Sequence, residues 1–162
     1  MLNEKLLKKF NRTEFSIKGD KGVVATFHIR RMPAIEGADA FDEVRGFIAD
    51  GFGTASKAED DLEFLANLVK CIPASHMKPL RSALFAYVDY AHSIHETSKT
   101  TLAGDEYTAF SGQGFDAVYE VLLRALVVNF LTPMEGLWRS LKAEVETSGP
   151  SANSALPTSS TA

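Results

Sequence analysis

Apolar residues are most concentrated in the stretch 115–131. After Asp116, only Glu120, Arg124 and Asn129 interrupt a run of aliphatic and aromatic side chains there. A helix that is apolar nearly all round forms either the buried centre of a domain or a surface for another chain. At roughly 1.5 Å per residue it would span about 25 Å, which is short for a membrane span, and it is also too polar. We therefore expect a central helix and no membrane partner.

Apolar residues at helical spacing predict further helices on both sides of this stretch. The helix over 38–48 is expected to stop at Gly51 and Gly53, because glycine weakens a helix interior. Ser56 has capping-box spacing to Glu59, which predicts the start of the next helix. The predicted helices cover 2–10, 38–48, 56–72, 77–94 and 115–131, followed by a last helix that begins at Pro133.

Prolines set two of these boundaries. Pro73 ends the helix that precedes it. Thr132 and Pro133 supply a capping residue and a proline at the first helical position, so the last helix is expected to start there. Residues 96–104 are a loop by composition, and 105–110 form either a turn of helix or a short extended piece. The apolar stripe of the last helix comprises Leu137, Trp138, Leu141 and Val145.

Two β-prone runs near the N-terminus predict a hairpin over 12–31. Residues 13–18 alternate polar and apolar, residues 23–31 are rich in β-branched side chains, and a Gly/Asp turn joins them. An isolated hairpin is marginal in water, so its apolar face should pack on the helices or its edge should extend with a partner strand. Proline ends the second strand at Met32-Pro33.

The expected fold is α+β and mainly α, with the N-terminal hairpin followed by a bundle of about five helices. A length of 162 residues fits one domain, here 1–146, and the Ser/Thr/Pro-rich residues 147–162 are a disordered tail by composition. The net charge of −4 does not indicate the basic surface that a nucleic-acid-binding protein needs. Cys71 stands alone and the N-terminus lacks a signal-peptide pattern, so we expect a cytoplasmic protein.

Candidate chemistry is sparse. Within the predicted helix 77–94 and just beyond it, Asp89, His92, His95 and Glu96 have a spacing that could bring metal ligands together, although a solvated polar helix end is the favoured explanation. The glycine-containing stretch near Gly53 lacks the spacing of a phosphate-binding loop. We expect no cofactor.

The remaining feature is the surplus of apolar side chains on the central helix. The simpler interpretation is a core helix covered on all sides, and the functional one is that one side receives an amphipathic helix of a partner. Both hold if the protein forms a homo-oligomer. The candidate partner-binding side comprises Phe115, Tyr119, Leu122, Leu126 and Phe130, and the opposite side comprises Val118, Val121, Ala125 and Val128.

The layout and three short segments resemble the tail assembly chaperones of tailed bacteriophages. The segments are Arg31-Met32-Pro33-Ala34 at the hairpin exit, Ala109-Phe110-Ser111-Gly112, and the apolar run 119–130 that ends in Val-Asn-Phe. The resemblance covers residues 12–131. The chain departs from it after Phe130, where relatives often continue with Asp and more Phe and this chain has Leu131-Thr132-Pro133.

The resemblance implies a non-catalytic protein that binds the tape measure protein, keeps its long apolar helices soluble and helps tail-tube subunits assemble. Such a chaperone acts in the host cytoplasm and is not expected in the mature virion. The alternative is a small helical adaptor or a regulator that sequesters a host protein. A third hypothesis is a metal-dependent enzyme that uses Asp89, His92 and His95.

Overall fold

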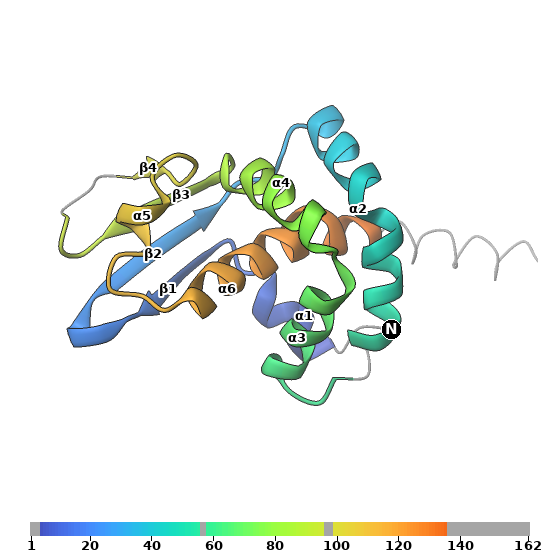
Figure 1. The fold of residues 1–162 in the computed structure, drawn as a ribbon, viewed down its shortest axis with the longest axis horizontal. Helices are drawn as coiled ribbons and strands as arrows, with labels where there is room; N and C mark the ends of the chain where they lie inside the picture. The colour runs from blue at the N-terminus through green and yellow to red at the C-terminus, as the bar shows by residue number, and fades with distance from the viewer. Residues whose placement is uncertain (1–3, 56–57, 96–98, 136–162) are drawn as a thin grey trace, which may run out of the picture.

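The computed structural model describes residues 4–55, 58–95 and 99–135, and the predicted tail and the stripe from Leu137 to Val145 lie outside them (Figure 1). The described residues form a mixed α+β fold with one four-stranded antiparallel sheet. The strands are β1 (Glu14–Lys18), β2 (Val24–Ile29), β3 (Val88–His92) and β4 (Thr100–Thr101). The helices are α1 (Glu4–Phe10), α2 (Ala34–Ala55), α3 (Asp61–Cys71), α4 (Ala74–Phe85), α5 (Glu106–Ala109) and α6 (Phe115–Leu126).

The predicted hairpin is confirmed. Strands β1 and β2 pair antiparallel with Phe15 opposite Phe27, and a short 3-10 turn, η1 (Asp20–Gly22), joins them. Lys21 and Gly22 both have positive φ, at 56° and 76°, and the glycine adopts this conformation without strain. Local turn chemistry therefore closes the hairpin as the sequence predicted.

The predicted helix over 77–94 is wrong in its second half. Helix α4 ends at Phe85, and β3 pairs with β2, placing Val88 opposite Ile29 and His92 opposite Ala25. In β3, Val88, Tyr90 and His92 are buried and the residues between them are half-buried, which is the period of two of a strand. The sequence left open whether a partner strand extends the hairpin. In the structure β3 of the same chain pairs with β2 and extends it, and β4 pairs with β3.

The glycines after residue 48 do not end the second helix. Helix α2 begins at Ala34 and continues through Gly51 and Gly53 to Ala55, so the predicted stop is wrong. Each glycine costs about 1 kcal/mol relative to alanine in a helix interior. Packing of α2 along α3 offsets that cost, because tertiary contacts supply most of a helix's stability.

The cap of the next helix also differs from the prediction. The N-cap of α3 is Asp60, whose carboxylate accepts a 2.8 Å hydrogen bond from the amide of Glu63. The Glu63 carboxylate accepts one from the amide of Glu59 at 3.0 Å. The cap is therefore four residues beyond Ser56, which itself lies outside the described residues.

The segment 105–110, which the sequence left undecided, forms one turn of helix, α5. Two buried side chains of β3 hold this turn and the residue that follows the segment, Ser111, against the sheet. The Tyr90 hydroxyl donates to the Asp105 carboxylate, and Nε2 of His92 lies 2.9 Å from the carbonyl oxygen of Ser111. That oxygen can only accept, so Nε2 carries the proton, while Nδ1 accepts from the amide of Ile94.

The central helix does not end before Pro133. After Leu126 it widens into a π-helical turn, η2 (Val127–Leu131), and continues in helical geometry to Glu135. Thr132 has helical dihedrals, so the predicted new start at Pro133 is wrong, and its hydroxyl hydrogen-bonds Asn11 instead of capping. A proline clashes with the carbonyl four residues earlier in a regular α-helix, and the wider π turn relieves that clash.

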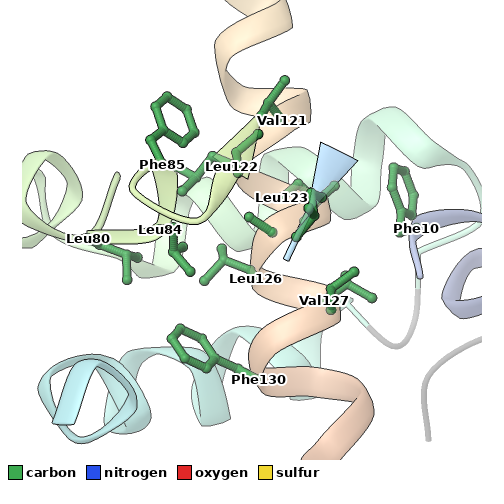
Figure 2. Packing of buried hydrophobic residues seen from close by; sticks show 14 of the residues in the cluster. Phe10, Leu80, Leu84, Phe85, Val121, Leu122, Leu123, Leu126, Val127 and Phe130 are labelled. Carbon is green, nitrogen blue, oxygen red and sulfur yellow. The ribbon is translucent and has the colours of Figure 1, made fainter. Parts of the chain in front are cut away.

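Figure 1 shows α6 running between the sheet and helices α2, α3 and α4. It contacts α3, α4 and β2, and η2 contacts α1 and α2. Figure 2 shows Phe10 of α1 approaching this helix from the side opposite Leu80, Leu84 and Phe85 of α4. By length and composition, the helix Phe115–Glu135 could cross a membrane. However, 61% of its 18-residue apolar segment is buried inside the domain. Its hydrophobicity therefore has an explanation in the core.

Candidate functional site

Three of the five candidate partner-binding residues are core residues. Leu122, Leu126 and Phe130 expose only 2%, 4% and 2% of their surfaces, and the Phe130 ring lies 5.6 Å from that of Phe41 on α2. A cavity of about 10 Å³ beside Leu122 and Leu126 is no larger than roughly one water-sized probe. In the folded domain these side chains are not accessible to another chain.

The opposite side of α6 is buried as well. Val121, Ala125 and Val128 are buried and Val118 is half-buried, so the helix is covered on both sides. This burial fits the interpretation of a central core helix.

The accessible part of the candidate face is the first turn of α6. Phe115 is 81% exposed and Tyr119 is half-buried, and their rings meet edge to face at 6.4 Å. Two aromatic side chains make a small apolar surface, much less than a helix-binding groove requires.

Of the candidate metal ligands, Glu96 lies outside the described residues, and the other three are not gathered at one point. Asp89 and His92 lie three residues apart on β3, so they point to opposite faces of the sheet, whereas the prediction assumed a helix. The Asp89 carboxylate accepts a 3.0 Å hydrogen bond from Arg30, and His92 is buried over Ser111. The His95 ring lies 4.7 Å from that of His92. Among the described residues, no group of three His, Cys, Asp or Glu side chains is arranged to hold a metal.

Two of the segments that resemble tail assembly chaperones meet in the fold. The amide of Met32, at the hairpin exit, donates to Oδ1 of Asn129 at 2.8 Å, and Nδ2 of Asn129 donates to the carbonyl of Ala125 at 3.1 Å. One asparagine side chain thus connects the end of the hairpin with the π turn of the central helix. These residues stabilise the fold and expose little surface for binding.

A groove between α2 and α4 is open on the surface of the described residues. Helix α2 contributes Ala40, Glu43 and Val44. Helix α4 contributes His76, Pro79, Leu80 and Ala83. Most of this lining is apolar, and the volume of about 230 Å³ is below the roughly 300–1,000 Å³ typical of small-molecule pockets. The dimensions suit a few side chains of a docked helix.

Side-chain contacts fix both ends of this groove. At one end, the Tyr87 hydroxyl donates to the carboxylate of Glu36, one turn before Ala40 on α2. At the other end, the His76 ring lies 5.1 Å from that of Phe47. These contacts link α2 to α4 and to the residues just after α4 at the two ends of the groove.

The sequence pattern did not reveal the groove. The apolar periodicity of residues 38–48 indicates the buried face of the helix, which carries Val44 and Ile48, and gives no sign of a second accessible surface. Small side chains at Ala40 and Ala83 leave the hollow, but alanine is also an ordinary helix residue, so neither position gives a signal by itself.

Comparisons of the chain with protein-family models, with curated proteins and with solved structures find no match.

Proposed function

We propose that the protein is a non-catalytic assembly chaperone that covers an apolar helix of a client. The observation that carries this proposal is the mostly apolar groove between α2 and α4. A helix docked in such a groove would place apolar side chains against Ala40, Pro79 and Ala83, which are accessible on the two walls, and remain soluble. Since the groove is small, binding is weak and releasable, as a chaperone needs.

The client suggested by the resemblance to tail assembly chaperones is the tape measure protein of a phage tail, with the tail-tube protein as a second partner. A long helical protein exposes apolar stripes before the tube forms around it. A protein of net charge −4 with a rigid core can cover such stripes without aggregating itself. A helical adaptor that sequesters a host protein would use the same groove and differ only in its partner.

Co-expression with the tape measure protein tests the proposal. Soluble recovery of the tape measure protein should rise with the wild-type chain and fall back with Ala40→Trp or Ala83→Trp, since either indole fills the groove. Ala66→Trp is the matched control, because Ala66 is an exposed alanine on α3 outside the groove. Unchanged recovery with the wild-type chain would overturn the proposal. Equal effects of all three variants would show that the groove is not the site that binds the client.

A further inference from the structure

The α2 wall of the groove is acidic. Glu36, Asp39 and Glu43 follow one another at spacings of three and four, which places them along one face of the helix, and all three are exposed. Ala40 and Glu43 line the groove itself, so this acidic row borders the apolar surface along its length.

These carboxylates are poorly compensated. The only partner of Glu36 that the structure records is the neutral Tyr87 hydroxyl. Within residues 4–55, 58–95 and 99–135, neither Asp39 nor Glu43 has an ion-pair partner, whereas the neighbouring Asp42 has Arg45 at 3.9 Å. The part of the groove lining that comes from these residues includes no lysine or arginine.

We infer that the groove selects an amphipathic helix whose apolar face is bordered by lysine or arginine. This inference rests on the proposed function and specifies the client segment. Lysine or arginine beside the apolar face of the docked helix would lie against the acidic row on α2. A client helix with glutamate or aspartate at those positions would be repelled by the same row. Exposed charges of this kind act mainly on partner selection and on the association rate.

Calorimetric titration of the full-length protein with two synthetic helical peptides tests the inference. Both carry leucines at positions i, i+4 and i+7, and one has lysines and the other glutamates beside them. The lysine peptide should bind about tenfold more tightly at about 0.1 M salt, and the difference should shrink at about 1 M salt, where the Debye length falls to about 3 Å.

A charge-matched pair of variants separates the acidic row from the net charge of the protein. Asp39→Asn with Glu43→Gln should remove most of the preference for the lysine peptide. Glu14→Gln with Asp20→Asn changes the net charge equally at exposed positions of the hairpin and should leave the preference intact.

Three outcomes count against specific claims. Equal binding of both peptides overturns the charge inference and leaves the proposed function standing. Equal loss of preference in both double variants also overturns it, because net charge then explains the selection. Binding of neither peptide overturns the inference together with the groove on which the proposed function rests.

Discussion

The side-chain oxygen of Asn129 accepts a 2.8 Å hydrogen bond from the backbone amide of Met32, which is 97 residues earlier in the chain. The same side chain donates to the carbonyl of Ala125. Through these two bonds Asn129 connects the hairpin exit with the central helix at its π turn. The pair explains why a polar residue lies in so apolar a stretch.

Asn129→Ala should therefore destabilise the protein by roughly 1–3 kcal/mol, because it leaves the Met32 amide without its acceptor. Asn129→Asp keeps an acceptor for the Met32 amide but places a carboxylate oxygen against the carbonyl of Ala125, so it should also destabilise the protein. Thr132→Val is the control, since it removes an exposed side-chain hydrogen bond to Asn11 and should change stability by no more than about 0.5 kcal/mol. Urea unfolding measures all three, and equal effects of Asn129→Ala and Thr132→Val would contradict the assignment.

Arg124 is expected to hold α1 against the central helix. Its guanidinium lies 4.4 Å from the ring centroid of Phe15 and 5.2 Å from that of Phe10, and it donates to the carbonyl of Lys9 at 3.1 Å. Arg124→Lys should cost roughly 1–3 kcal/mol, because an ammonium group cannot stack on both rings and keep that hydrogen bond.

Hydrogen exchange gives the specific readout for this substitution, since amide protection in α1 should fall before that in the sheet. Arg45→Lys is the control, because Arg45 is exposed and its ion pair with Asp42 is long at 3.9 Å. Unchanged protection of α1 in Arg124→Lys would show that the helix is held by other contacts.

Substitutions along α6 and η2 should separate core positions from surface positions. Phe130→Ala should cost roughly 3–5 kcal/mol because its ring is buried, and Leu122→Asp should prevent folding. Phe115→Asp should leave stability within about 0.5 kcal/mol because that side chain is 81% exposed.

Thermal melts measured beside client pull-downs decide this prediction. A Leu122→Asp variant that folds normally but loses its client would show that the central helix is a binding face after all.

The stability of the protein should fall at alkaline pH through Tyr90. Burial, together with the hydrogen bond to Asp105, raises the pKa of Tyr90 from 10.0 to about 12. Below pH 10.0 both the folded and the unfolded chain keep this proton, so the contribution of Tyr90 to stability is constant. Between pH 10.0 and about 12 only the unfolded chain loses it, so the free energy of unfolding decreases.

Tyr90→Phe should remove this pH-dependent decrease in the free energy of unfolding. The difference in unfolding free energy between wild type and variant should be flat below pH 10.0 and shrink from there to about pH 12. A constant difference across that range would show that Tyr90 has the same pKa in both states. Denaturant titrations at stepped pH provide the measurement.

The sequence by itself determined the features that depend on neighbouring residues. The hairpin follows from the turn at Lys21 and Gly22, the end of α3 from Pro73, and the central helix from the long apolar run that begins at Phe115. Each of these rests on backbone conformation or on hydrophobic periodicity within a short window, so it can be predicted without knowing what lies nearby.

Only the tertiary structure decided the features that depend on distant residues. Residues 88–92 fit a helical pattern locally, but pairing of Val88 with Ile29 and of His92 with Ala25 makes them a strand. Helix α2 continues through Gly51 and Gly53 because α3 packs along it. The groove exists because α2 and α4 are held apart with small side chains between them, and no single helix encodes that separation. Non-local packing energy outweighs a local preference of about 1 kcal/mol per residue, and it is absent from any short stretch of sequence.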